Sequence, residues 1–176
     1  MIVKTLSVGP IQANCYIVGC KKTRQAAIID PGDEATRILK TVEDLGLVVT
    51  HILLTHGHFD HIGAADEVTK ASGASLGIHS DDLPLLNMGG GAFFFGVHPP
   101  PVPEPTIHLA ADQEIPIGEL TLRVLHTPGH TPGHVTFYEA NQSAIFDGDV
   151  LFAMGIGRTD LPGGSHHTLM HSITQQ

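Results

Sequence analysis

The sequence predicts one α+β domain over residues 1–176, in which sheets are covered by helices on their outer faces. Short β-branched runs and amphipathic segments follow one another along the chain, and this pattern is typical of layered sheets and helices. A length of 176 residues suits a single domain with a sizeable core. The 20 glycines and 12 prolines place turn signals between the runs, so we expect short elements.

The elements of the first half follow from these patterns in order. Residues 34–45 carry apolar side chains at helical spacing before Gly46, which predicts an amphipathic helix with a stop signal. The apolar, β-branched run 48–54 predicts a buried strand, and residues 62–72 predict a second helix. Further strands are predicted at 2–8, 15–18, 26–29 and 75–79, and a short helix is predicted near 80–86.

The second half is richer in predicted strands, and a helix begins at Ser165 near its end. Residues 87–105 combine a three-glycine run, three consecutive phenylalanines and a proline-rich stretch, so we expect no regular structure there. They could form a connecting loop with its phenylalanines on the core, a wall or lid of an active site, or a contact between copies. The strands of this half are predicted at 114–117, 120–125, 134–138 and 143–146.

The composition and charge of the sequence limit the classes of partner that we expect. The formal net charge is -9, and after Arg123 the sole lysine or arginine is Arg158, so nucleic-acid binding is not expected. The N-terminus lacks a secretory pattern and the sequence has no apolar run of membrane-spanning length, so we expect no membrane partner and a cytoplasmic location. Two cysteines make no disulfide framework, and the apolar neighbours of Cys15 predict a buried, inert thiol.

A histidine-rich segment directly follows an apolar run and carries the strongest chemical signal in the chain. His56 and His58 flank Gly57, which we expect to let the backbone turn so that both rings reach one ion. Asp60 and His61 are adjacent, so their side chains diverge and can serve a second ion. Nitrogen and carboxylate ligands without thiolate favour zinc, iron or manganese over a structural zinc–thiolate site.

Two later segments complete the predicted site. His130 lies in a turn fixed by proline and glycine after one strand, and Asp149 follows another strand, where its carboxylate could bridge two ions. Residues 28–33 resemble residues 145–149, and the first histidine motif resembles the turn that carries His130. The echo indicates two similar sheet halves that bring ligand loops to one edge.

With these residues in place, the chain resembles the metallo-β-lactamase superfamily. Residues 55–61 match the HxHxDH motif of that superfamily, and His130 and Asp149 match its next two ligand positions. Residues 14–16, 127–133 and 148–164 are most similar to the single-domain glyoxalase II-like (hydroxyacylglutathione hydrolase-like) thioesterases, and persulfide dioxygenases share much of the last stretch.

The resemblance implies a four-layer αββα sandwich, lacking the last elements, with two divalent metal ions at one edge of two facing sheets. Zinc is expected, with iron or manganese as alternatives. The resemblance assigns His56, His58 and His130 to one ion, Asp60 and His61 to the other, and Asp149 to a bridging position.

The resemblance also implies a substrate and a mechanism. The substrate is a small-molecule thioester such as S-lactoylglutathione, and a hydroxide held by the metal would attack its carbonyl. Asp60 would be catalytic by orienting that hydroxide while binding metal. Arg158 would bind the glutathione part; its alternative is a structural ion pair with Asp160 or Asp147.

The sequence departs from the family pattern at its end. The family carries a final metal-binding histidine in a Gly-His-Gly loop, whereas this sequence ends at Gln176 within a predicted helix. We therefore expect a truncated chain or a second metal site that lacks a ligand. His166, His167 and His171 are poor substitutes because they lie on or beside that helix.

The remaining histidines are expected to be structural. His51 and His126 lie in predicted strands, and His134 is close enough to the site to support a ligand. His79, His98 and His108 have no partners at ligand spacing.

Two other functions stay open beside thioester hydrolysis. One is an iron-dependent persulfide dioxygenase, with a single iron held by His56, His130 and Asp149. The other is an inactive, truncated metal-binding domain that acts through protein contacts. Shared fold alone does not decide between them.

Overall fold

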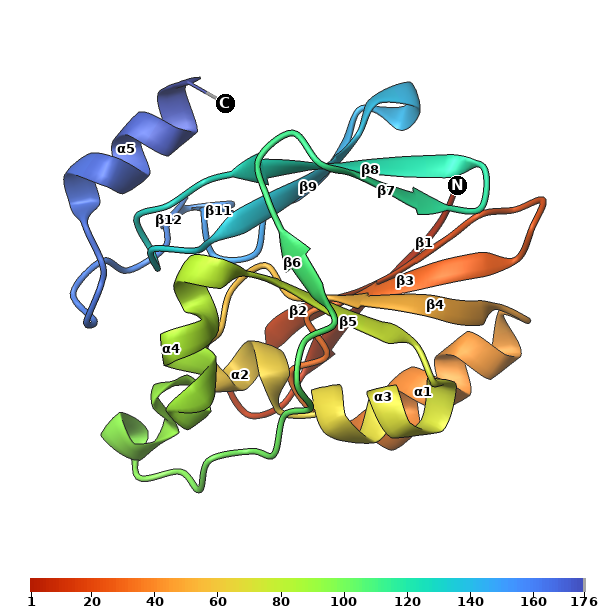
Figure 1. Ribbon diagram of the computed structural model, residues 1–176, viewed down its shortest axis with the longest axis horizontal. Coiled ribbons are helices and arrows are strands. Elements are labelled where there is room, and N and C mark those ends of the chain that lie inside the picture. Colours follow the sequence, from red (N-terminus) through yellow and green to blue (C-terminus); the bar gives the residue numbers. More distant parts are fainter. Residues whose placement is uncertain (176) are drawn as a thin grey trace.

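Two facing sheets with helices outside them form the body of the computed structural model, which describes residues 1–175 (Figure 1). The six-stranded sheet contains β1 (Ile2–Val8), β2 (Ala13–Gly19), β3 (Gln25–Ile29), β4 (Val48–Leu53), β5 (Ser75–His79) and β6 (Ile107–Leu109), in that order. The four-stranded sheet has the order β10 (Ala144–Phe146), β9 (Val135–Glu139), β8 (Leu120–His126) and β7 (Glu114–Ile117).

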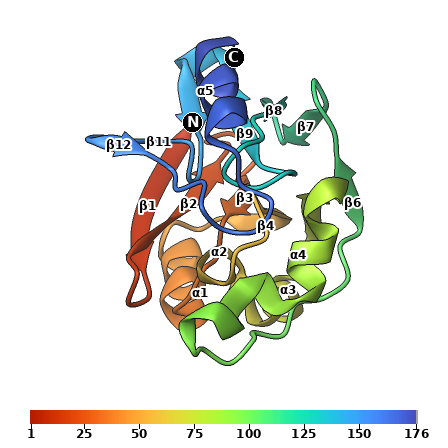
Figure 2. The ribbon, with the colours of Figure 1, turned by 90° about the vertical axis from the view of Figure 1, so that its left-hand side faces the viewer.

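The helices are α1 (Ala35–Asp44), α2 (Phe59–Ile62), α3 (Ala65–Ser72), α4 (Leu83–Asn87) and α5 (His166–Gln175), with 3₁₀ turns η1 (Ser80–Asp82), η2 (Gly89–Phe95) and η3 (Ala140–Gln142). Strands β11 (Leu151–Phe152) and β12 (Gly155–Ile156) form a separate ribbon that projects away from both sheets (Figure 2). Among residues 1–175, every helix is too short or too polar to traverse a lipid bilayer. The α+β sandwich predicted from the sequence is confirmed.

The six-stranded sheet changes direction at β3, and this places the functional edge. Strands β1 to β3 pair antiparallel, whereas β3 to β6 pair parallel. The carboxyl ends of parallel strands meet at one edge of a sheet. Asp30 after β3, Thr55 after β4 and Ser80 after β5 therefore begin loops on the same edge.

Two apolar cores lie on the two faces of this sheet. Successive side chains of a strand point to opposite faces. On β3, Ile28 accordingly packs with Ile38 and Val68 of the helices, while Ile29 packs with Val124 and other side chains of the four-stranded sheet. Burial on both faces makes β3 and β4 rigid supports for the loops at their ends.

The four-stranded sheet brings its own loops to the same edge. It is antiparallel throughout. The turn 127–134 joins β8 to β9, and residues 147–149 follow β10. Helix α5 covers the turn, because Leu169 packs on Gly129 and the Ser172 hydroxyl donates to the Pro128 carbonyl oxygen at 2.8 Å.

The structure differs from the sequence prediction in several short elements. The helix predicted at 62–72 is interrupted, because Ala64 N–H donates to the Pro31 carbonyl oxygen at 2.9 Å and Gly63 lies against Gly32. Strands β6, β11 and β12 were not predicted, since two or three residues carry no periodic signal. Residues 89–95 form η2 where no regular structure was expected, and its three phenylalanines are exposed rather than packed on the core.

Candidate metal centre

Three buried imidazoles from two different sheets converge at the shared edge. His56 and His58 follow β4, and His130 lies in the turn between β8 and β9; their exposed fractions are 0%, 7% and 2%. One nitrogen from each lies within 4.8 Å of the others. The ring planes cross at 75° to 85°, so ring edges rather than faces meet. His58 Nδ1 lies 2.9 Å from His130 Nε2.

The electrostatics favour neutral rings for His56 and His58. Burial, together with the neighbouring histidines, lowers the pKa of His58 to about 3 and that of His56 well below its ordinary value. His56 Nε2 is buried and has no hydrogen-bond partner among the described residues. A buried polar atom without a partner is destabilising, and a metal ion would satisfy it. The three residues therefore fit a metal ion.

A second group lies beside the first, joined to it by Asp149. One oxygen of Asp149 lies 3.4 Å from His130 Nε2, and the other lies 3.3 Å from His61 Nε2. Asp60 Oδ2 is 3.7 Å from the same His61 nitrogen. Asp149 thus faces both groups, as expected of a carboxylate that spans two ions. Together, the fold and these His and Asp groups suggest two metal ions.

The carboxylates of the second group differ in their pKa values. Burial opposes the ionised form of Asp149, but the hydrogen bond from His61 and the charges of the neighbouring histidines together outweigh burial and lower the pKa of Asp149 to about 2. Burial raises the pKa of Asp60. Burial also opposes the charged form of His61, yet the carboxylates of Asp30 and Asp149 raise its pKa well above the ordinary value. Asp149 therefore ionises at a lower pH than Asp60 does.

Asp30 is a functional residue that sequence reasoning missed. It is fully buried, and its oxygens accept hydrogen bonds from Thr55 N–H at 2.7 Å, from the Thr55 hydroxyl at 2.6 Å and from His61 Nδ1 at 3.0 Å. Asp30, His56 and His61 also lie within ligand distance of one another. Because the oxygens of Asp30 are already taken, we interpret it as the partner that turns His61 Nε2 toward Asp149. The echo between residues 28–33 and 145–149 was the signal that could have found it.

Asp82 was also missed, and it ties the two histidine loops together. This fully buried carboxylate accepts from Gly57 N–H at 2.9 Å, from the Thr131 hydroxyl at 2.8 Å and from Gly133 N–H at 2.7 Å. Gly57 belongs to the loop of His56 and His58, whereas the other two donors lie in the turn that carries His130. Charge-assisted hydrogen bonds of this kind are roughly twice as strong as neutral ones. No sequence pattern pointed to Asp82.

Gly57 is required because it has no side chain, and not because its backbone adopts a conformation that favours glycine. This corrects the predicted role of Gly57 in turning the backbone. Its φ angle is not among the positive ones. A Cβ atom there would lie 3.3 Å from the Asp82 carbonyl oxygen and 3.3 Å from the Leu86 backbone nitrogen. The missing side chain therefore lets α4 and its preceding turn approach the histidine loop.

Further partners orient the histidine rings. His56 Nδ1 lies 2.9 Å from the Thr55 hydroxyl, and His130 Nδ1 lies 2.7 Å from the Arg158 carbonyl oxygen. His134 is fully buried, and its Nε2 accepts from Asp149 N–H at 3.2 Å. The supporting place predicted for His134 agrees with these contacts. Such outer hydrogen bonds fix which nitrogen of each ring faces the centre.

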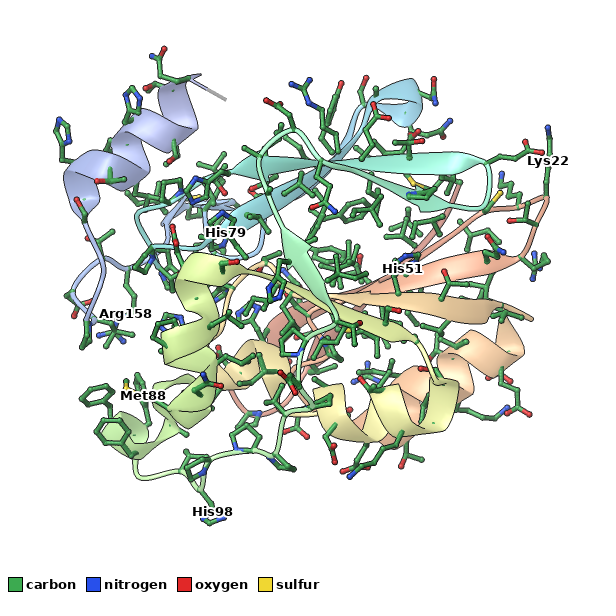
Figure 3. The ribbon with its side chains drawn as sticks, viewed as in Figure 1. Lys22, His51, His79, Met88, His98 and Arg158 are labelled. Carbon is green, nitrogen blue, oxygen red and sulfur yellow. The ribbon has the colours of Figure 1, made fainter. Side chains whose placement is uncertain are left out.

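Arg158 forms the structural ion pair that was one of its two predicted roles. Its Nε and one terminal nitrogen contact the two oxygens of Asp160, each at 2.8 Å, and not Asp147. The guanidinium carbon lies 5.9 Å from the centroid of the Phe95 ring. In Figure 3, Arg158 lies toward the same end of the molecule as Met88. Arg158 is half exposed, so the pair leaves part of the cation open to a ligand.

The other histidines are distributed as follows. His51 contacts the Thr50 hydroxyl at 2.9 Å, and His98 and His108 are exposed. His166, His167 and His171 are exposed on α5. The absence of partners predicted for His79 is wrong, because its ring stacks on that of His126 at 4.4 Å with Asp81 nearby. The tertiary structure brings these residues together from β5, η1 and β8.

Comparison with known proteins agrees with this centre. The family model of the metallo-beta-lactamase superfamily matches residues 8–176. The chain is 40% identical over 177 residues to the probable metallo-hydrolase YqgX of Bacillus subtilis, and 39% identical over 176 residues to the hydroxyacylglutathione hydrolase GloC of Haemophilus influenzae. Each alignment covers 98% of this chain and 82% of the relative.

Solved structures agree with the fold. BLEG-1 B3 metallo-beta-lactamase superimposes with a TM-score of 0.92 and 37% identity, covering 99% of this chain and 85% of that one. TTHA1623 in a di-iron-bound form superimposes with a TM-score of 0.87 and 37% identity, covering 98% of this chain and 85% of that one. ETHE1 from Myxococcus xanthus superimposes with a TM-score of 0.82 and 28% identity, covering 99% of this chain and 69% of that one. Fold, candidate centre and family match lead to one conclusion: this chain belongs to the metallo-beta-lactamase superfamily.

Proposed function

We propose that this protein is a metal-dependent hydrolase of thioesters such as S-lactoylglutathione. Membership in a superfamily of metallo-hydrolases supports an enzyme, and the hydroxyacylglutathione hydrolase among its relatives supports a small-molecule thioester. The observation that carries the proposal is the arrangement of Asp149, whose two oxygens face the two histidine groups at 3.3 Å and 3.4 Å.

In this proposal the residues divide between two ions. His56, His58 and His130 would hold the first, Asp60 and His61 would hold the second, and Asp149 would serve both. When bound, the ions supply Lewis acidity and a water of lowered pKa. Zinc is the proposed metal because the donors are nitrogen and carboxylate; the di-iron form of TTHA1623 makes iron the first alternative.

The side chains then have separate tasks. Asp60 is the proposed catalytic residue: its carboxylate is 20% exposed, so it can accept a hydrogen bond from the attacking water and orient it. In the overall reaction a carbon–oxygen bond forms at the carbonyl carbon and the carbon–sulfur bond breaks, giving a carboxylate and a thiol. A thiolate leaves readily, so no strong general acid is required of the chain. Arg158 is proposed to bind the carboxylates of the thiol part.

A second candidate is an iron-dependent persulfide dioxygenase. The resemblance of residues 148–164 to persulfide dioxygenases favours it. It would use one iron held by His56, His130 and Asp149. His130 Nε2 and Asp149 lie 3.4 Å apart, which agrees with a shared ion.

The test measures metal content and turnover on the same purified sample. We expect two ions per chain and release of thiol from S-lactoylglutathione. Asp60→Ala should lose hydrolysis by more than about 100-fold while its circular dichroism spectrum stays that of the wild type. Asp66→Ala is the matched control, because Asp66 lies on α3 and, among the described residues, its carboxylate forms an ion pair with Lys70 alone.

Three outcomes separate the candidates. Two ions with thiol release support the hydrolase. One iron with oxygen consumption on glutathione persulfide, and no thioester turnover, would replace it by the dioxygenase. Wild-type turnover in Asp60→Ala would remove Asp60 from the catalytic role.

A further inference from the structure

We infer that this site takes thioesters with an apolar acyl group, and that a cavity beside His58 holds that group. The inference rests on the proposed thioester hydrolysis and names the acyl class of its substrate. It assigns Phe94 and Met88 a part in specificity.

The cavity has an apolar lining next to the metal centre. It encloses about 240 Å³, and His58 forms part of its wall. Its main apolar lining residues are Leu85, Met88, Phe94, Phe95, Pro132 and Leu161. The sole ionisable side chains among its described lining residues are those of His58 and Asp81. An apolar group held in this cavity is removed from water and needs no polar partners.

The size and place of the cavity indicate which part of a substrate fits. Pockets for whole small ligands enclose roughly 300–1,000 Å³, so a cavity of about 240 Å³ takes one part of a substrate. Because His58 belongs to both the centre and the cavity wall, the group inside is attached to the reacting carbonyl. A peptide-like thiol carries charges, and burying unpaired charges among apolar side chains is strongly unfavourable. The acyl group is therefore the occupant.

Backbone contacts hold η2, which forms part of the cavity wall, against the histidine loop. Gly90 of η2 has φ +66°, and a Cβ atom there would lie 2.3 Å from the Phe59 backbone nitrogen. The Phe95 ring lies 5.3 Å from that of Phe59, the residue between His58 and Asp60. The position of η2 is thus set by the same segment that carries the proposed ligands.

Phe94 of η2 and Met88, which precedes η2, have exposed apolar surface that a bound acyl group can cover. Phe94 is 51% exposed and Met88 is also 51% exposed. Burial of apolar surface is favourable in proportion to its area. A hydroxyacyl group such as lactoyl places a hydroxyl against this lining, whereas a hexanoyl or benzoyl group covers it.

The test compares kcat/KM for a series of S-acyl glutathiones on the metal-loaded enzyme: acetyl, lactoyl, butanoyl, hexanoyl and benzoyl. Each added methylene should raise kcat/KM by about fourfold until the cavity is full. Lactoyl should be a poorer substrate than butanoyl.

Phe94→Ala and Phe93→Ala form a matched pair. Both rings are about half exposed, at 51% and 56%, but only Phe94 lines the cavity. Phe94→Ala should lower kcat/KM for hexanoyl by about tenfold and for acetyl by less than about twofold. The Phe93 ring contacts that of Phe94, with centroids 3.9 Å apart, but lies outside the cavity, so Phe93→Ala should alter the hexanoyl-to-acetyl ratio of kcat/KM far less than Phe94→Ala. Met88→Glu, on the rim, should reduce hexanoyl turnover in the same selective way.

The outcomes distinguish this inference from the proposed function. Hydrolysis of all acyl groups at similar kcat/KM would overturn the apolar preference and leave thioester hydrolysis standing. No hydrolysis of any of them by metal-loaded enzyme would overturn both. If Phe94→Ala altered the mass in solution but not the order of substrates, the face would belong to a contact between copies, and the inference would be wrong.

Discussion

Two histidine clusters in this molecule have similar composition but different geometry. His56, His58 and His130 form one; His79 and His126, with Asp81, form the other, and in each the possible ligand atoms lie within 4.8 Å. In the first the ring planes cross at 75° to 85°, whereas in the second they are nearly parallel, at 9°.

The angle between the rings decides what each cluster can do. A metal ion lies in the plane of each imidazole that binds it, along the nitrogen lone pair. Two parallel stacked rings have no common point in their planes, so His79 and His126 cannot share an ion in this arrangement. His126 Nε2 also contacts the Pro132 carbonyl oxygen at 3.0 Å, while His56 Nε2 has no hydrogen-bond partner within residues 1–175. Closeness of histidines is therefore a weaker sign of a metal site than convergence of their lone pairs.

The largest expected effect comes from removing a proposed ligand of the first cluster. His58→Ala should lower metal content to one ion or less per chain and reduce turnover by more than about 100-fold, beyond the loss typical of outer partners. Elemental analysis of the purified variant measures it. His79→Ala is the matched control and should keep full metal content. Loss of metal in the control instead would erase the distinction between the clusters.

A smaller and more selective effect is expected from Asp30→Asn. The amide would place an N–H₂ group against Thr55 or His61, which both donate to Asp30. The dissociation constant of the ion held with His61 should rise by about 10–100-fold, and that of the other ion by less. Competition with a chelator measures both constants. Asp33→Asn, exposed in the same loop, should change neither.

Asp82→Asn should weaken binding of the ion proposed for His56, His58 and His130 by about tenfold, because it loosens the link between the two loops that carry them. Its neighbour Asp81 belongs to the stacked cluster, so Asp81→Asn is the control within the comparison. Isothermal titration calorimetry with zinc measures the affinities. Equal effects of the two substitutions would mean that the three hydrogen bonds of Asp82 do not position the ligands.

The smallest effect is expected from His79→Ala on stability. Loss of the stacked pair should lower the free energy of unfolding by about 0.5–1.5 kcal/mol, the usual contribution of an aromatic pair. Urea denaturation of the metal-free protein measures it. A loss that appeared only when metal was present would indicate that the stacked cluster binds an ion after all.

Local patterns predicted most of the strands and the residues now found at the centre. The runs at 2–8, 75–79 and 114–117 match β1, β5 and β7 residue for residue, since alternation and β-branching are local properties. The predicted burial of Cys15 is also correct, and burial raises the pKa of its thiol. The helix predicted at 62–72 has the correct end at Ser72 but begins at Ala65, because the break before it depends on Pro31 and Gly32, which are distant in sequence.

By itself, the sequence determined the fold class, the edge where the ligand loops gather and the set of residues proposed to bind metal. These depend on spacing within single segments and on motifs that can be read in order. Only the tertiary structure decided that Asp30 and Asp82 support those residues, that His79 stacks on His126 and that Phe94 faces a cavity. Each of these depends on contacts between segments 25 to 51 residues apart or on the angle between side chains, and neither leaves a periodic trace in the sequence.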